Sequence, residues 1–216
     1  FFFKSIIPVI NQVKGTICTI DECLSPDTTI ESLESLNPSF KELGEGGVDK
    51  IQLKYFPELD KITHIHTAGN SPAMSDAASI TLLSKSKNSA SSKYKARAKI
   101  KAVAVVNDNP LFVLSGCVEA TKQLLKNQKL QIKDIDIFEI HEAFASTIIY
   151  AQRELEIPDD KLNVNGGCIA LGHPMGATGS IMLSSLLDEM ERRDLSLGVV
   201  STSGAAGAGT ALLIER

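Results

Sequence analysis

The stretch NVNGGCIALGHPMGATGS, residues 163–180, carries one histidine, His173, among glycines and directly before a proline. Glycine permits backbone torsions that other residues avoid, and it lets the backbone approach a ligand closely. Pro174 has a fixed φ and is favoured in the first turn of a helix. The pattern therefore predicts a tight loop that presents His173 at a helix start, where the positive end of the helix dipole favours a neutral imidazole.

Two other interpretations of this stretch stay open from the residues alone. One is a glycine-rich turn with an incidental surface histidine. The other is a loop that cradles a phosphate. A dinucleotide site is excluded, because no G-x-G-x-x-G lies between a predicted strand and a predicted helix.

The composition is that of an ordinary soluble globular protein: 216 residues, 43% hydrophobic and 22% charged, with a net charge of -4. We expect no nucleic-acid partner, because no basic cluster could follow a phosphate backbone. No apolar run reaches the roughly 18 residues of a membrane span, and no signal peptide is visible. The four cysteines lack zinc-site spacing, and the pair His64 and His66 lacks further ligands, so we expect reduced thiols, no metal and a cytoplasmic protein. The chain also lacks an initiator methionine, as a piece of a longer protein would.

Predicted strands and helices alternate along the second half of the chain, which favours a layered α/β fold. Strands are expected at 98–106, 134–140, 197–202 and 210–216, and helices at 117–130, 142–155 and around 183–190.

The first half mixes turns with shorter elements. A capping box of Thr28 and Glu31 predicts a short helix. The segment 41–50 is rich in glycine and charge and is predicted to be an exposed loop, and a second helix is expected from about Asp76. The serine-rich segment 86–97 is a predicted boundary.

Three further stretches carry candidate site residues. EIHEAFA, residues 139–145, places His141 where a strand joins a helix, a common position for active-site residues in α/β folds. HTAGNSPAMSD, residues 66–76, is a small polar loop. VVSTSGAAGAGTALLIER, residues 199–216, is a strand, a glycine turn and a strand, which predicts a hairpin. Taken singly, each stretch could be structural: a lone histidine, a helix cap and an ordinary hairpin.

Taken together and in this order, these stretches resemble the thiolase family. Residues 163–180 match the family's histidine block almost residue for residue, EIHEAFA resembles its N-E-A-F-A block, and HTAGNSPAMSD resembles T-A-G-N-x-S-x-x-x-D. DECLSPDTTIESLESLNPSF, residues 21–40, and FFFKSIIPV, residues 1–9, also resemble family segments. The resemblance covers essentially the whole chain and begins about halfway along a typical thiolase.

The resemblance implies a thiolase-like layered α/β/α fold with a five-stranded mixed sheet and without the first half of the fold. Residues 1–62 would belong to the loop region that clamps coenzyme A, 63–95 would finish the N-terminal domain, and 96–216 would form the C-terminal domain. Such a piece would expose a large apolar face on its own, so we expect it to be unstable or to aggregate without its other half.

The resemblance also implies chemistry. Thiolases are acyltransferases of fatty-acid metabolism that join or cleave acyl-CoA thioesters without a prosthetic group, and they usually form dimers or tetramers. His173 would activate a nucleophilic cysteine and bind the thioester oxygen, and His141 would hold a water at the same oxygen. Donors aimed at such an oxygen each contribute typically about 2.7–4 kcal/mol. Asn70, Ser71 and Ser75 would contact the pantetheine arm of CoA.

The sequence departs from the family pattern at functional positions. None of the four cysteines matches the nucleophile, which would lie before Phe1. The acid/base cysteine position is Ser203, whose hydroxyl is far less acidic than a thiol and needs a partner base. Ala205 stands where a backbone N–H serves an oxyanion hole, and Pro72 replaces a CoA-contacting serine.

Three hypotheses therefore remain. The chain is part of a thiolase-like enzyme, which His173 and His141 favour. It is a thiolase-like module that binds acyl-CoA or a partner without catalysis, which Ser203 favours. It is a structural subunit of an oligomer, which nothing in the sequence separates from the second.

Overall fold

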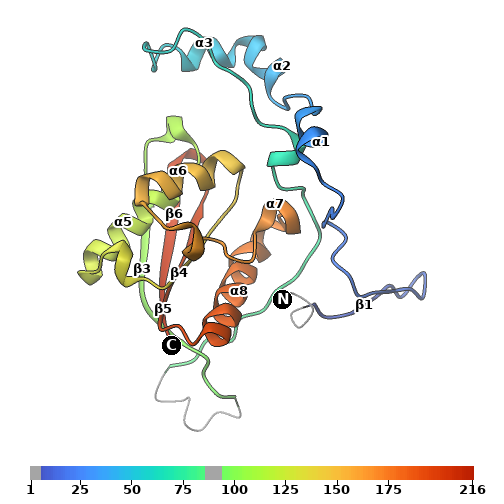
Figure 1. The fold of residues 1–216 in the computed structure, drawn as a ribbon, viewed down its shortest axis with the longest axis vertical. Helices are drawn as coiled ribbons and strands as arrows, with labels where there is room; N and C mark the ends of the chain where they lie inside the picture. Colours follow the sequence, from blue (N-terminus) through green and yellow to red (C-terminus); the bar gives the residue numbers. More distant parts are fainter. Residues whose placement is uncertain (1–5, 86–93) are drawn as a thin grey trace.

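The computed structural model describes residues 6–85 and 94–216 (Figure 1). Its core lies in the second range, where strands and helices alternate as the sequence predicts. The strands are β3 (Lys99–Asn107), β4 (Ile137–Ile140), β5 (Leu197–Ser203) and β6 (Ala208–Glu215), and the helices are α5 (Gly116–Gln128), α6 (Ala145–Leu155), α7 (Cys168–Leu171) and α8 (Thr178–Arg193).

The core strands form one mixed sheet in the order β3-β6-β5-β4. Strands β4 and β5 run parallel, whereas β6 is antiparallel to both of its neighbours. The hairpin predicted for the C-terminus is therefore present between β5 and β6. Because Ile140 pairs with Ser201, the carboxyl ends of β4 and β5 lie side by side. This register brings His141 next to the turn that begins after Ser203.

The α/β fold with a mixed sheet is confirmed. The prediction of five strands is wrong, because within the described residues this sheet has four strands. Leu162 makes a single parallel bridge to Phe138, at the outer edge of β4. The next residue, Asn163, has a φ of 42°, which turns the chain out of strand geometry. Its side chain continues the pairing instead, since its amide accepts from Ile140 N and donates to Ile140 O, both at 2.8 Å.

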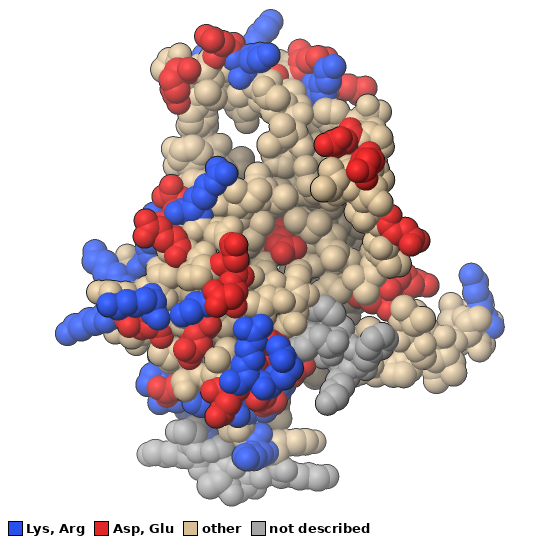
Figure 2. Space-filling view, in the orientation of Figure 1, with Lys and Arg blue, Asp and Glu red and all other residues tan. Residues whose placement is uncertain are grey.

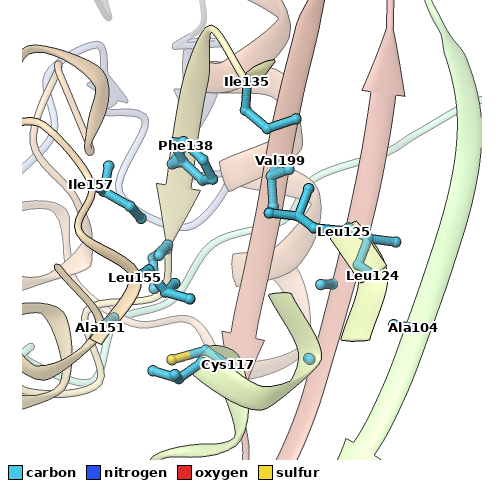
Figure 3. Packing of buried hydrophobic residues seen from close by; sticks show 14 of the residues in the cluster. Ala104, Cys117, Leu124, Leu125, Ile135, Phe138, Ala151, Leu155, Ile157 and Val199 are labelled. Atoms are coloured by element: carbon cyan, nitrogen blue, oxygen red, sulfur yellow. The ribbon is translucent and has the colours of Figure 1, made fainter. Parts of the chain in front are cut away.

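Helices α5 and α6 cover one face of the sheet and bury the larger apolar cluster (Figure 3). Alternation along each strand sends every second side chain to this face. Phe138, Leu124 and Ile135 are fully buried there. The residues of the cluster that Figure 3 labels are Ala104, Cys117, Leu124, Leu125, Ile135, Phe138, Ala151, Leu155, Ile157 and Val199.

Helix α8 covers the other face and completes an α/β/α arrangement (Figure 1). Ile137, Val200 and Ile214 from the sheet pack there with Leu186 and Met190. In strand β4 the residues two and four positions after Ile137 share its face, which are Glu139 and His141. The candidate site therefore lies on the α8 side of the sheet.

Residues 6–70 form a strap that runs outside this core, with α2 and α3 at its far end in Figure 1. Its elements are the hairpin of β1 (Val9–Ile10) and β2 (Ile17–Cys18), α1 (Ile30–Glu34), α2 (Lys41–Leu43), a π-helical segment (Gly44–Val48) and α3 (Asp49–Gln52).

Two expectations for the strap are corrected. The capping box is made by Thr29 and Ser32, one residue later than expected, because these two side chains each accept from the other's backbone N–H. The segment 41–50 is helical and not a loop. Gly44 is buried, and a Cβ there would lie 2.4 Å from Asp49 and His64, so this glycine serves close packing.

The helix expected from Asp76 is absent, because residues 75–85 form neither a helix nor a strand. Ile80 is 95% exposed and Leu82 is 72% exposed. A short helix is stable in water mainly when it buries an apolar face, and this segment buries none. Most of the predicted boundary at 86–97, and the first residues of FFFKSIIPV, lie outside the described residues.

Aromatic contacts hold the strap on the core. The rings of His66 and Phe144 lie 4.7 Å apart, Phe40 packs against both, and His66 Nε2 lies 2.9 Å from Ser146 Oγ. Phe144 and Ser146 stand at the start of α6, so the strap is fastened close to His141.

The surface combines intermingled charges with exposed apolar side chains. Figure 2 shows acidic and basic residues interspersed on this face of the molecule. On the edge strand β3, Val103 is 54% exposed and Val105 is 73% exposed. Among residues 6–85 and 94–216, no helix combines the length and the apolar character needed to cross a membrane.

We predict that the isolated 216-residue chain aggregates, because Val103, Val105 and Ile80 lie in water. Replacing Val103 and Val105 by threonine should raise the soluble fraction several-fold and lower the binding of a hydrophobic dye. The checks are size-exclusion chromatography and dye fluorescence. A monodisperse original chain with cooperative unfolding and no dye binding would contradict the prediction.

Candidate active site

His141 is fixed by the end of strand β4. Its backbone N–H donates to Ser201 O at 2.9 Å, which continues the β4–β5 pairing by one residue. The side chain is 6% exposed, and its ring bonds to the backbone of Ser203. Nε2 has no hydrogen-bond partner among the described residues. One ring nitrogen of His141 is thus anchored and the other is available to a ligand.

His173 is fixed by the glycine-rich block. Gly172, with a φ of 85°, ends α7 and turns the chain, and the backbone N–H of His173 donates to Ala73 O at 2.7 Å. Nδ1 of the ring lies 2.8 Å from Oγ1 of Thr178, the buried first residue of α8. Within the described part of the chain the structure gives Nε2 of His173 no hydrogen-bond partner. The half-buried imidazole is therefore oriented by the first residue of helix α8.

The two histidines meet although they come from separate motifs. Their ring centroids lie 4.6 Å apart, with 44° between the ring planes. Burial, together with the nearby His173, lowers the pKa of His141 to about 4. Burial also lowers the pKa of His173. Both rings are therefore neutral near pH 7, so each can donate one hydrogen bond and accept another.

Glu139 lies on the same face of β4, two residues before His141. It is 3% exposed, and Oε1 has no partner among the described residues. Burial raises its pKa to about 8, with the nearby carboxylates of Glu142 and Glu189 adding to the shift. Glu189 itself bonds to Arg192 and Asn165, which lower its pKa to about 2. Glu139 is thus a neutral carboxylic acid near pH 7, on the same face of the sheet as His141.

Ser203, the third predicted catalytic residue, ends β5 beside His141, but its hydroxyl is engaged elsewhere. Oγ donates to Leu114 O at 2.7 Å and accepts from Cys117 N at 2.9 Å. Leu114 lies two residues before α5 and Cys117 lies in its first turn, and α5 covers the other face of the sheet. Ala205 follows as an exposed residue at the start of the 3₁₀ turn Ala205–Gly207, close to the same edge.

The three predicted CoA-binding residues lie at the end of the strap and directly after it, within residues 70–75. Asn70 shapes this loop, since its amide donates to Ile65 O and accepts from Thr67 N, both at 2.8 Å. Ser71 donates weakly to Asn70 at 3.4 Å. Ser75 packs directly on Gly172, and its buried Oγ has no partner among the described residues. Of the three, Ser75 is the one the structure brings to His173.

Sequence reasoning missed Thr178, Cys23 and Glu142 as members of the site. Thr178 orients His173. A hydroxyl residue at the start of the helix that follows the histidine could have indicated this role. Cys23 packs on Gly172. This contact joins the strap to the glycine-rich block, and no local sequence pattern indicates it. Glu142 stood inside the quoted EIHEAFA motif but was given no role, although its carboxylate contacts the glycine-rich block.

His64 and His66, the histidines outside the pair, each have a hydrogen-bond partner. His64 Nε2 lies 3.0 Å from Asp49, and His66 bonds to Ser146. Within the described residues, no three histidine, cysteine or acidic side chains gather as a metal site requires. All cysteines are free, and burial raises the pKa of Cys168 to about 12.

Comparison with known proteins agrees with this geometry. Residues 94–216 match the family model described as "Thiolase, C-terminal domain". The chain belongs to the thiolase family. A 3-ketoacyl-CoA thiolase from Serratia proteamaculans (strain 568) is 37% identical over 222 residues, which cover 100% of this chain and 52% of that protein.

Solved structures give the same result. The acetyl-CoA acetyltransferase of Bacillus anthracis superposes with a TM-score of 0.84 at 29% identity, covering 99% of this chain and 50% of that one. Human mitochondrial 3-ketoacyl-CoA thiolase in complex with CoA superposes with a TM-score of 0.78 at 30% identity, covering 97% and 47%. The chain thus spans about half the length of the relatives it matches.

We predict that Gly172→Ala disrupts the site. A Cβ at Gly172 would lie 2.5 Å from Ser75 Oγ and 2.9 Å from Cys23 Sγ, and alanine strongly disfavours this backbone conformation, at a cost of about 1–3 kcal/mol. Thermal unfolding of the full-length protein should show the loss. Gly176→Ala is the matched control, because its Cβ meets nothing within 4 Å. Equal melting temperatures for the two variants would refute the prediction.

We also predict that Glu139 makes stability fall as the pH rises. Its pKa is about 8 in the folded protein and near 4.5 when unfolded, so between these values the folded state holds an extra proton. Glu139→Gln should remove most of the decline in melting temperature between pH 5 and pH 9, on the order of several degrees. Glu156→Gln, on the surface, should keep the original slope. Identical pH profiles for the original protein and Glu139→Gln would show that this carboxyl ionises normally.

Proposed function

We propose that the full-length protein is a thiolase-type acyltransferase that acts on acyl-CoA thioesters, by Claisen condensation or by thiolytic cleavage of 3-ketoacyl-CoA. The observation that carries the proposal is the 4.6 Å contact between His141 and His173, two neutral imidazoles from separate motifs. Relatives named 3-ketoacyl-CoA thiolase, 37% identical to this chain, support the same chemistry.

In this proposal His173 takes the proton of a nucleophilic cysteine and helps bind the thioester oxygen. Its Nδ1 bond to Thr178 fixes the ring, so Nε2 is the nitrogen that meets the reactants. His141 offers Nε2 at the same place and holds a water at that oxygen. A neutral His173 is the form that can accept a proton, and the lowered pKa values keep both rings in that form near pH 7.

The other assignments belong to the same proposal. CoA ester is the substrate, Asn70, Ser71 and Ser75 contact its pantetheine arm, and no prosthetic group takes part. Residues 1–62 act as a CoA clamp, 63–95 complete the N-terminal domain, and 96–216 are the C-terminal domain. The protein works in the cytoplasm as a homodimer or homotetramer. Ala205 supplies a backbone N–H to an oxyanion hole, and Ser203 occupies the acid/base position.

A second candidate function is supported by Ser203 itself. Its hydroxyl bonds to backbone atoms of Leu114, just before α5, and of Cys117, in the first turn of α5, which is the arrangement of a structural serine. A homologue that binds acyl-CoA without catalysis would need no acid/base group at this position. The alternative is therefore a non-catalytic acyl-CoA-binding protein with the thiolase fold.

The test is cleavage of acetoacetyl-CoA and of a longer 3-ketoacyl-CoA by the full-length protein in the presence of CoA. His173→Ala should lower kcat at least about 100-fold, as expected for the loss of a group that stabilises the transition state. Glu156→Gln should leave it unchanged. Turnover unaffected by His173→Ala would refute the proposal.

Substitution of Ser203 separates the two candidate functions. If Ser203 is the acid/base group, Ser203→Cys should raise kcat and Ser203→Ala should abolish turnover. If the protein only binds, calorimetry will show CoA-ester affinity in the original protein, no turnover in any variant, and a lower melting temperature for Ser203→Ala.

A further inference from the structure

The two histidines depend on segments that lie far apart in the sequence, and one side chain joins these segments. Glu142 directly follows His141. Its Oε1 accepts from Asn163 Nδ2 at 3.0 Å, and its Oε2 accepts from the backbone N–H of Ile169 at 3.1 Å. Both donors lie in the stretch that leads to His173. The two carboxylate oxygens therefore bind two separate points of the histidine block.

Asn163 extends this connection back to strand β4. The Asn163 amide accepts from Ile140 N and donates to Ile140 O, so its orientation is fixed. Its second N–H points to Glu142. His141 is thus enclosed between Ile140 and Glu142, and the same asparagine binds both neighbours. A rotation of the His141 backbone would break bonds on either side of it.

The packing leaves the carboxylate little room to move. A Cβ on Gly167 would lie 2.4 Å from Cδ of Glu142, so glycine at this position lets the carboxyl group approach the backbone. Cys168 Sγ donates to the backbone O of Glu142 at 3.1 Å. The block is therefore bound to Glu142 through both its side chain and its main chain.

We propose that Glu142 is a positioning residue: its carboxylate braces the loop of His141 against the histidine block and so sets the spacing of the two imidazoles. This inference rests on the proposed function, since the spacing matters for a thioester oxygen that meets the Nε2 atoms of both rings. Glu142 acts through the histidines and takes no proton from the reactants. Catalytic groups need support of this kind, because a misplacement of about 1 Å can cost roughly 100-fold in rate.

The bonding pattern makes glutamate and glutamine unequal. A glutamine can still accept from Ile169 N through its oxygen. Its NH₂ group would then face the NH₂ group of Asn163, and the asparagine cannot turn over without losing both bonds to Ile140. Glu142→Gln should therefore keep the hydrogen bond from Ile169 and lose the one from Asn163, and Glu142→Ala should lose both.

The experiment compares Glu142→Ala, Glu142→Gln and the surface control Glu156→Gln in the full-length protein. We expect Glu142→Ala to lower kcat by about 100-fold while KM for acetoacetyl-CoA changes less than about threefold, with Glu142→Gln in between and the control unchanged. The ring ¹⁵N signals of His141 and His173, assigned by His→Gln variants, should shift in Glu142→Ala. The signal of His64, which pairs with Asp49, should stay in place.

The outcomes are distinct. A folded Glu142→Ala variant with a lower melting temperature but unchanged kcat and histidine signals would overturn the inference, since the residue would then be merely structural. If the original protein fails to cleave any 3-ketoacyl-CoA, the proposed function falls. The histidine signals then test the positioning role of Glu142 by themselves. Shifted ¹⁵N signals of both rings in Glu142→Ala support that role, and unchanged signals refute it.

Discussion

The approach of two uncharged imidazoles at the end of a parallel strand pair is the constraint on which the site depends. His141 reaches its position because β4 pairs with β5 in a register that carries it to the turn after Ser203. His173 reaches its position because Gly172 adopts a conformation that other residues strongly disfavour. Two protonated rings could not share a 4.6 Å contact without strong repulsion, so burial and proximity together keep them neutral.

Around this contact, different hydrogen bonds hold each histidine in place. Thr178 fixes the ring of His173 from within α8, and backbone bonds to Ser201 and Ser203 fix His141 from within the sheet. Glu139, two residues before His141 on the same strand, stays protonated, which avoids an unpaired buried charge. Such preorganisation suits a site that must stabilise charge as it develops on a substrate oxygen.

The sequence predicted most of the core because its signals were local and strong. Alternation in residues 134–140 and the glycine turn after Ser203 predicted strands that the structure contains. Contacts between distant segments were beyond its reach. No local sequence pattern shows that the Asn163 side chain continues the pairing at β4 or that Gly44 serves close packing. Nor does one show that the Ser203 hydroxyl bonds to the backbone at the start of α5. The helix expected from Asp76 is absent because this segment buries no apolar face against the rest of the described chain.

The question that separates an enzyme from a binding protein is where the acyl group lies. The most direct measurement is an experimental structure of the full-length protein with a bound 3-ketoacyl-CoA or acetyl-CoA. We predict the thioester oxygen within hydrogen-bond distance of Nε2 of His173 and, directly or through one water, of Nε2 of His141. A bound ester whose acyl group lies on another surface, with the two rings turned away from it, would contradict this assignment.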